Sequence, residues 1–360
     1  MKTLLLAPEL FRAEGGIARI LRSYLKALCE VAGEGDSVHY LALNDDAPAA
    51  SKANRFTNGR NGEHVGCSRS KLGFICHSFR LGWDSHRVIC GHLHQLPVAW
   101  LVSLFRPRME YHLIAHGIEV WRPYGWLERK ALRGARRILC VSEYTRRQML
   151  RFHPGLDRAK VVVVPNTFDA EFSTPTGKMS GAGSRSGPRI LVVSRLTQAD
   201  AYKGIDTMIE AMPVVLRQLP SAQLRIVGGG DDLVRLQQLV GALGLDGVVH
   251  LTGIVGDEAL RAEYAGCDIF ALPSRKEGFG LVYLEAMSYG KPCLAARAGG
   301  APEVVNSEVG ALVEYGNTDQ IAVAVADLVR HLRAPAAMLN RAKEFSYPAF
   351  MRRLATALQE

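Results

Sequence analysis

Two series of short apolar segments alternate with helical patterns along this chain of 360 residues. Apolar segments without polar alternation are typical of strands in a parallel sheet that helices cover on both faces. The sequence therefore predicts an α/β fold of two Rossmann-like domains, each with a parallel sheet. The expected strands are 4–7, 38–43, 87–90, 111–115, 138–141 and 161–164 in the first series, and 189–193, 224–227, 248–251, 269–272, 292–295 and 311–313 in the second.

Residues 173–187 separate the two series and consist mostly of Ser, Thr, Gly, Pro and Ala. This composition is typical of a linker. We therefore expect an amino-terminal domain over 1–172, a carboxyl-terminal domain over 188–345, and a last helix over 346–360 that packs back toward the amino-terminal domain. Proteins of this kind bind ligands in the cleft that faces the carboxyl ends of the strands.

The net charge of +9 lies entirely in the first half of the chain. Residues 1–172 hold 25 Lys and Arg against 16 Asp and Glu, whereas residues 173–360 hold 19 of each. Many of the cations fall within 122–160, beside Trp121, Tyr124, Trp126 and Phe152. Cations with aromatic residues on helices suit an anionic membrane surface, and a solvated helical face is the alternative. Nucleic acid is a poorer partner, because no nucleic-acid-binding motif accompanies the charge.

Other features predict a cytoplasmic protein. The seven cysteines are scattered without a CxxC pair, which indicates reduced thiols. The chain has no signal-peptide pattern and no stretch of about 18 apolar residues. The polar, basic residues 44–71 are interpreted as a mobile loop, in which Asp45 and Asp46 are solvated. His92 and His94 lack a third metal ligand at a useful spacing, so we expect them as a pair at a strand end near the cleft and predict no metal site.

The segment 273–292 joins the end of a strand to a glycine-containing turn and a helix. The turn is Glu277-Gly278-Phe279-Gly280, and the helix is expected from Leu281 to Tyr289, with Glu285 inside it. A glycine-rich turn that opens a helix presents N–H groups that suit phosphate. Carboxylates accept hydrogen bonds from hydroxyls, so a polyhydroxylated phosphate ligand is expected. Turn chemistry with a solvated carboxylate is the alternative.

Two cations stand at strand-to-helix junctions in the second series. Arg195 directly follows the strand 189–193, and Lys203 precedes a helical pattern over 207–216. Arg and Lys in such positions can neutralise a diphosphate, although each taken alone also fits an ordinary surface cation. Gly228-Gly229-Gly230 resembles a nicotinamide-binding turn, but the following Gly and the acidic residue on the next strand are missing.

Together these segments resemble the retaining glycosyltransferases of family four, which have the GT-B fold. The resemblance covers essentially the whole chain. Its specific parts are Glu277-Gly278-Phe279-Gly280 with Glu285-Ala286-Met287, Arg195 with Lys203, Gly15-Gly16-Ile17, His116-Gly117-Ile118, 141–145, 164–166, and Ala298-Gly299-Gly300 with Glu303. One departure is the polar loop 196–202, where many relatives carry a shorter loop with a proline.

The resemblance implies a donor that is a nucleotide diphosphate sugar, linked to UDP or GDP. Arg195 and Lys203 would hold the diphosphate, Glu285 the ribose hydroxyls, and Glu277 the sugar hydroxyls. The turn Gly278-Phe279-Gly280-Leu281 would add backbone N–H groups.

In the amino-terminal domain, Gly15 and Gly16 would lie close to the sugar and the diphosphate. His116 would touch the sugar near the reacting carbon. The implied catalytic residues are thus His116, Glu277, Arg195 and Lys203.

The implied reaction moves a hexose with retention to a hydroxyl of a saccharide acceptor, commonly lipid-linked, in bacterial polysaccharide or glycoconjugate biosynthesis. Relatives often act on such acceptors at the inner membrane surface, so the resemblance also implies a cytoplasmic protein that is either free or peripheral on the inner face of the plasma membrane. Retention in this family is usually explained by front-face attack, in which a phosphate oxygen takes the acceptor proton. No protein nucleophile, metal or cofactor is then required, and Glu277 as a nucleophile is the competing idea. The alternatives are a nucleotide-sugar epimerase or phosphorylase of the same fold, a transferase to a small-molecule acceptor, and a non-catalytic binding protein.

Overall fold

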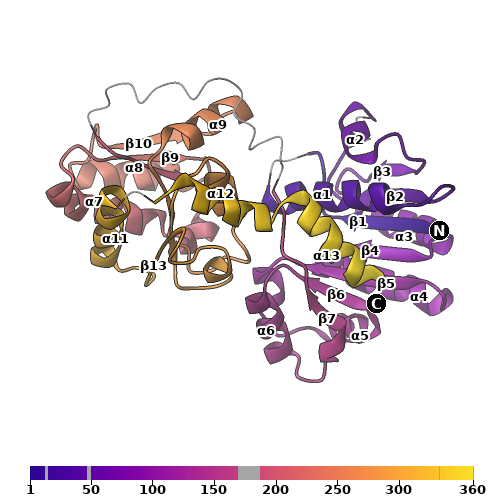
Figure 1. Cartoon of the computed structure of the whole chain (residues 1–360). Helices are drawn as coiled ribbons and strands as arrows, with labels where there is room; N and C mark the ends of the chain where they lie inside the picture. The colour runs from indigo at the N-terminus through magenta and orange to yellow at the C-terminus, as the bar shows by residue number, and fades with distance from the viewer. Residues whose placement is uncertain (13–14, 47–49, 169–186, 332, 360) are drawn as a thin grey trace. The chain divides into compact units, whose positions relative to one another are not determined.

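The computed structural model divides into two compact units (Figure 1). Unit 1 comprises Met1–Asp169 and Tyr347–Glu360, and unit 2 comprises Ala170–Ser346. Residues 173–186 of the expected linker lie outside the part that the structure describes. The described residues are 1–12, 15–46, 50–168, 187–331 and 333–359.

Unit 1 contains a parallel sheet, whose described strands lie in the order β3-β2-β1-β4-β5-β6-β7. The strands are β1 (Lys2–Ala7), β2 (Ser37–Ala42), β3 (His64–Gly66), β4 (Arg87–Cys90), β5 (Glu110–Ala115), β6 (Arg137–Cys140) and β7 (Val161–Val163). The helices are α1 (Gly16–Val31), α2 (Ala50–Thr57), α3 (Lys71–Trp83), α4 (Leu96–Phe105), α5 (Trp126–Gly134), α6 (Glu143–Phe152) and α13 (Tyr347–Gln359), with 3-10 turns η1 (Leu93–Gln95), η2 (Ile118–Val120) and η3 (Arg158–Lys160).

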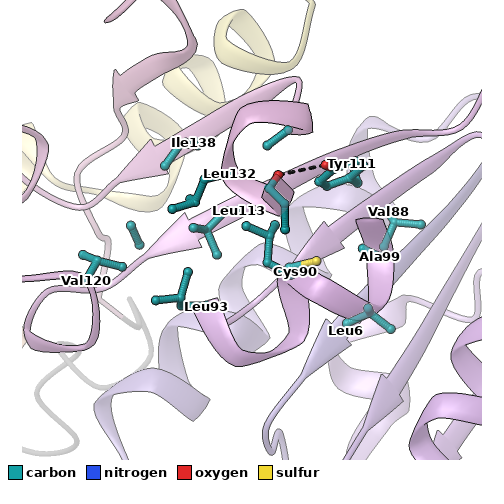
Figure 2. Close-up of a cluster of buried hydrophobic side chains, with 14 of the residues drawn as sticks. Leu6, Val88, Cys90, Leu93, Ala99, Tyr111, Leu113, Val120, Leu132 and Ile138 are labelled. Atoms are coloured by element: carbon teal, nitrogen blue, oxygen red, sulfur yellow. Dashed lines mark hydrogen bonds between the residues drawn. The ribbon is translucent and has the colours of Figure 1, made fainter. Parts of the chain in front are cut away.

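The first strand shows why this sheet is covered on both faces. Successive side chains of a strand point to opposite faces, so Leu4 and Leu6 join one buried cluster while Leu5 and Ala7 join another. Figure 2 shows part of the first cluster, where the Tyr111 hydroxyl donates to a carbonyl oxygen of α5 at 2.8 Å. Helices α3, α4, α5 and α6 contribute to the first cluster, and α1, α2 and α13 to the second.

The last helix belongs to unit 1, although the chain reaches it from unit 2. The ring of Phe350 meets that of Tyr24 edge to face at 4.9 Å. The Tyr347 hydroxyl donates to Glu30 Oε2 at 2.8 Å. Apolar packing and a hydrogen bond therefore attach α13 to α1.

Unit 2 contains a second parallel sheet, with its described strands in the order β10-β9-β8-β11-β12-β13. The prediction of two parallel-sheet domains is thus confirmed. The strands are β8 (Arg189–Val193), β9 (Gln223–Val227), β10 (Val249–Gly253), β11 (Ile269–Leu272), β12 (Cys293–Ala296) and β13 (Gly310–Val313). The helices are α7 (Ile205–Gln218), α8 (Leu233–Ala242), α9 (Asp257–Gly266), α10 (Leu281–Ser288), α11 (Thr318–Arg330) and α12 (Pro335–Glu344), with 3-10 turns η4 (Gln198–Lys203) and η5 (Ala301–Glu303).

The interpretation of residues 44–71 as a mobile loop is wrong. The described part of this segment forms α2 and β3, and β3 is the edge strand of the unit 1 sheet. Ala53 is buried, and the Phe56 ring contacts Phe11 at 5.9 Å. These two residues lie three apart on α2, so a short apolar stripe suffices to dock a helix that is otherwise polar.

All seven cysteines are free, and six of them are buried. Cys76 on α3 is the exposed one. The six buried cysteines therefore pack as small apolar side chains, and the reduced state of the thiols stays a prediction.

Candidate active site

The order of the strands reverses once in each sheet, between β1 and β4 in unit 1 and between β8 and β11 in unit 2. Open α/β sheets bind ligands at the carboxyl ends of the strands beside such a reversal. In unit 2 the loops at this point are 194–204 and 273–280. These loops carry Arg195, Lys203 and Glu277, three of the predicted site residues.

Lys203 and Glu277 form an ion pair at the reversal in unit 2. Lys203 Nζ lies 2.6 Å from Glu277 Oε2, and the two side chains expose only 18% and 14% of their surface. The structure thus brings together two predicted residues that are 74 positions apart in the chain. An ammonium group has three donors, so two remain for a ligand such as a phosphate oxygen.

Two glycines hold the loop that carries Glu277. Gly300 N–H donates to the Glu277 carbonyl oxygen at 2.6 Å. Gly299 has φ +61°, and a Cβ there would lie 2.4 Å from the same oxygen. Any side chain at Gly299 would therefore displace Glu277, so the Ala298-Gly299-Gly300 segment supports the loop that carries Glu277.

The loop that carries Lys203 packs against the loop 273–280, which carries Glu277. Gly204 has φ +73° and begins α7, and a Cβ there would lie 2.8 Å from the Pro273 carbonyl oxygen. Arg275 N–H donates to the Tyr202 carbonyl oxygen at 2.8 Å. These contacts fix Lys203 beside the loop of Glu277.

The polar loop between Arg195 and Lys203 forms η4, which is organised by Asp200. The Asp200 carboxylate is buried and accepts from Thr197 Oγ1 at 2.9 Å and from the Tyr202 hydroxyl at 2.8 Å. Asp200 also pairs with Arg195 at 3.1 Å. The sequence analysis did not identify Asp200 as a site residue, because a buried carboxylate has no signature of its own in a polar loop.

Arg195 presents its side chain to solvent, with 73% of it exposed. Its guanidinium pairs with Asp200, which places it beside η4, and the described residues show no pair between Arg195 and Glu277. The backbone around it approaches the glycine turn after β9: Leu196 N–H donates to the Gly229 carbonyl oxygen at 3.0 Å. A Cβ at Gly228 would lie 1.7 Å from the Ser194 carbonyl oxygen. The glycines of this turn therefore make room for the Arg195 loop.

The turn before α10 gives its helix an open amino terminus. Gly280 has φ +95°, and a Cβ there would lie 2.4 Å from the Tyr283 ring. By their position, the N–H groups of Leu281 and Val282 have no acceptor within the helix. The Phe279 side chain is buried against Phe345, at a ring separation of 5.3 Å. The Phe279 side chain is therefore not available to an anion, whereas the backbone N–H groups from Gly278 to Leu281 are.

Glu285 lies on the second turn of α10 and is buried, with 5% exposed. Its Oε2 accepts from the Tyr264 hydroxyl at 2.8 Å. The structure therefore places Glu285 away from free solvent. Its expected role toward ribose hydroxyls stays a prediction.

In unit 1, His116 follows β5 and is held in one tautomer. Its Nε2 lies 2.8 Å from the Gly91 carbonyl oxygen, which can only accept, so Nε2 carries the proton. Its backbone N–H donates to Glu119 at 2.5 Å. Burial lowers the pKa of His116 to about 4, so the ring is neutral at pH 7. Nδ1 is buried without a hydrogen-bond partner in the described residues, which leaves one acceptor unused.

Gly15 and Gly16 lie at the start of α1, beside the strand reversal of unit 1. Within the part of the chain that the structure describes, a Cβ at either position would meet nothing within 4 Å, and neither glycine has a positive φ. Internal packing therefore does not require glycine here, and the open space suits the close approach of a ligand.

Asp45 holds the loop after β1 that leads toward these glycines. The prediction that Asp45 is solvated is wrong, because its carboxylate is buried and accepts from the backbone N–H groups of Leu10, Phe11 and Arg12 at 3.0 to 3.3 Å. Such a carboxylate satisfies donors that would otherwise be stranded. Asp45 therefore positions the loop after β1. The sequence gives no sign of this role, because Asp45 stands among other polar residues.

His92 and His94 follow β4, with ring centroids 4.7 Å apart. His92 Nδ1 accepts from the His94 N–H at 3.2 Å, and burial lowers the His92 pKa to about 4. Within the described residues, no group of three or more His, Cys, Asp or Glu side chains is placed to hold a metal ion.

Two family models match the chain. Residues 183–345 match the model described as "Glycosyl transferases group 1", and residues 14–172 match the model described as "Glycosyltransferase Family 4". The first match contains the Lys203–Glu277 pair, and the second contains His116 and Gly15.

Similar proteins are known from bacteria. The chain is 35% identical over 271 residues to the GDP-mannose-dependent alpha-(1-6)-phosphatidylinositol monomannoside mannosyltransferase of Mycolicibacterium smegmatis, which covers 67% of each chain. The Mycobacterium tuberculosis (H37Rv) protein of the same name is 34% identical over 238 residues, and the alignment covers 59% of each chain. Among solved structures, Anabaena Alr3699/HepE in complex with UDP has the same fold, with a TM-score of 0.79 at 22% identity over 100% of both chains.

Proposed function

Since this chain belongs to the group 1 glycosyl transferases, we propose that it moves a hexose from a nucleotide diphosphate sugar to a hydroxyl of a lipid-linked saccharide acceptor. The names of the mycobacterial relatives support this donor class and this acceptor class, and they make GDP-mannose the first donor to test. UDP-linked hexoses are the second group, because the Anabaena structure holds UDP.

The observation that carries the proposal is the Lys203–Glu277 pair at the strand reversal of unit 2. Lys203 has donors left for the diphosphate, and Glu277 has a second carboxylate oxygen, Oε1, that can accept from a hydroxyl. The ammonium group suits the diphosphate of a nucleotide diphosphate sugar, and the carboxylate oxygen beside it suits the hydroxyls of the sugar.

The charge that develops on the departing diphosphate would be stabilised from three sides. Lys203 offers a fixed ammonium group, and Arg195 offers an exposed guanidinium that Asp200 orients. The amino terminus of α10 adds free N–H groups and the positive end of its dipole. Such groups supply positive charge where it is needed in the transition state.

We propose a front-face mechanism with retention. The acceptor hydroxyl attacks on the side of the leaving group, its oxygen forms the new bond to the anomeric carbon as the bond to the diphosphate oxygen breaks, and a phosphate oxygen takes the proton. Glu277 is a poor nucleophile in this arrangement, because one of its oxygens is engaged by Lys203 at 2.6 Å. No step needs a metal ion when Lys203 and Arg195 neutralise the leaving group.

His116 would accept a hydrogen bond from a sugar hydroxyl through Nδ1, the buried ring atom without a partner in the described residues. Its low pKa keeps this atom an acceptor at pH 7. Gly15 and Gly16 would admit the sugar and diphosphate, because no packing contact fills the space beside them.

The test is an assay of sugar transfer from GDP- and UDP-linked hexoses to lipid-linked saccharides, with the anomeric configuration of the product read by nuclear magnetic resonance. We expect transfer with retained configuration, and loss of transfer in Lys203→Ala and Glu285→Ala while the fold survives. Lys343→Ala on α12, an exposed lysine, is the matched control. Full activity in either site variant would reject the site assignment, and an inverted product would reject the mechanism.

A further inference from the structure

Three neighbouring helices of unit 1 expose large apolar side chains. Helices α3, α4 and α5 pack against one another in sequence order and cover the first buried cluster (Figure 1). Of the fifteen large apolar side chains exposed among the described residues, seven lie on these helices, so their exposure is concentrated on one part of unit 1. They are Leu72, Ile75 and Trp83 on α3, Leu104 and Phe105 on α4, and Trp126 and Leu127 on α5.

The exposed apolar residues of α3 form one stripe with the half-buried Phe79, on a different face from the buried Phe74 and Leu81. They recur at spacings of three and four residues, which places them on a single helical face. Leu72 exposes 77% of its surface, so this face has no protein covering at its start. The members of the stripe are Leu72, Ile75, Phe79 and Trp83.

Aromatic contacts join the three helices into one surface, which we call the α3–α5 face. The Phe79 ring on α3 lies 6.3 Å from the Phe105 ring on α4. The Trp100 ring on α4 meets the Trp126 ring on α5 edge to face at 6.5 Å. Phe105 and Trp126 each expose 63% of their surface, so the rings that connect the helices also face outward.

The charge within and beside this face is mostly positive. Within their bounds α3 and α4 contain no Asp or Glu, and α5 contains only Glu128, which pairs with Arg122 at 2.6 Å. Two further acids lie beside the face: Asp84 directly follows α3, and Glu63 pairs with Arg80. The Arg106 guanidinium, at the end of α4, lies 5.5 Å from the Trp83 ring. The cations on or directly after the three helices are Lys71, Arg80, Arg106, Arg108, Arg129, Lys130 and Arg133.

We infer that the α3–α5 face docks on the surface of a bilayer that contains anionic lipid. Trp and Phe side chains prefer the headgroup level, and Lys and Arg are attracted to lipid phosphates. No described helix is long and apolar enough to cross a membrane, so this contact lies on the surface of the bilayer. The inference rests on the proposed function, because a lipid-linked acceptor lies in a membrane.

Two details make the inference specific. None of the exposed large apolar side chains lies on α6. Of the two helices in the basic segment 122–160, α5 is therefore the one that contributes to the membrane contact. A second copy of the chain is a poorer occupant, because a two-fold contact would place these cations against one another.

Cys76 provides a direct test. It lies within α3 beside Ile75 and is the exposed cysteine among seven, so a dye with environment-sensitive emission can be attached there without substitution. Vesicles of phosphatidylcholine with phosphatidylglycerol are compared with vesicles of phosphatidylcholine alone. We expect the emission to shift to shorter wavelength with the anionic vesicles only. An unchanged emission, or equal shifts with both kinds of vesicle, would overturn the inference.

Variants separate the face from the rest of the protein. Trp126→Ser and Phe105→Ser should each weaken binding to anionic vesicles about tenfold, and Lys130→Glu about fivefold or more. Val323→Ser on α11, which removes an exposed apolar side chain from unit 2, is the matched control and should bind as the unaltered protein does. Equal binding by all four variants would overturn the inference. So would self-association without lipid that Phe105→Ser abolishes, because it would assign the face to a second copy.

Turnover of the donor distinguishes this inference from the proposed function. Trp126→Ser should transfer sugar to a water-soluble acceptor analogue at the unaltered rate, because Trp126 is not a site residue. If the protein turns over donor but does not bind anionic vesicles, the inference fails and the proposed function stands. If it binds vesicles as expected but turns over no nucleotide sugar, the proposed function fails.

Discussion

Replacement of Lys203 by Met tests whether its ion pair with Glu277 organises the donor site. The paired atoms lie 2.6 Å apart, and the side chains are 18% and 14% exposed. At an effective dielectric constant of about 20, two unit charges at that distance attract by roughly 6 kcal/mol before the cost of desolvation. Removal of one partner of a buried pair costs about 3–5 kcal/mol, because the other charge stays buried. Since both side chains keep some contact with water, we expect the lower value, about 3 kcal/mol.

Thermal denaturation followed by circular dichroism measures this cost. A change of 1 kcal/mol moves Tm by about 2–4 °C for a domain of this size, so Lys203→Met should lower Tm by about 6–12 °C. The addition of Glu277→Gln removes the stranded charge and should restore at least half of the loss. Lys343→Met, the exposed control, should change the free energy of unfolding by less than about 0.5 kcal/mol. Equal Tm values for Lys203→Met and Lys343→Met would refute the reasoning.

Three further predictions concern the glycines and the buried histidines. Gly299→Ala should lower the free energy of unfolding by about 1–3 kcal/mol and weaken nucleotide binding in calorimetry, because its φ is +61° and its Cβ would clash with Glu277. Unchanged binding would show that this turn does not support the nucleotide site. Gly15→Leu should leave Tm within about 2 °C but raise the donor KM at least tenfold, because its side chain would occupy space that packing leaves open; an unchanged KM would contradict a ligand there. Burial lowers the pKa of His112 to about 3 and of His116 to about 4, so below pH 6.5 the unfolded chain binds protons that the native chain excludes. The free energy of unfolding should therefore fall as the pH drops from 6.5 toward 4, and a urea midpoint that is flat over this range would contradict the burial of these rings.

The strands were predictable because parallel strands that are buried on both faces are continuous apolar runs. The run Leu4 to Ala7 is such a case, since alternate side chains feed two cores. The 44–71 segment was misinterpreted because its docking depends on a few apolar positions, Ala53 and Phe56 among them, in an otherwise polar stretch. Local periodicity gives little signal for so short a helix.

Residues that the structure brings together in the candidate site could be named from the sequence where a residue type and a turn signal coincide, as at Lys203 before Gly204 and at Glu277 before Gly278. The positioning carboxylates Asp45 and Asp200 were not found, because they accept hydrogen bonds from groups that only the folded chain brings near. The dependence of Glu277 on Gly299 was hidden for the same reason: the two lie 22 positions apart in the sequence, and their contact exists only in the tertiary structure.

The most direct test of the account is the rate of sugar transfer by the double variant Lys203→Met/Glu277→Gln, measured at saturating nucleotide diphosphate sugar. This variant removes both charges together, so its fold should be largely retained. The account predicts that kcat falls by about 10²- to 10³-fold, because the departing diphosphate loses its fixed cation. A kcat close to that of the unaltered protein would show that the Lys203–Glu277 pair does not take part in the transfer.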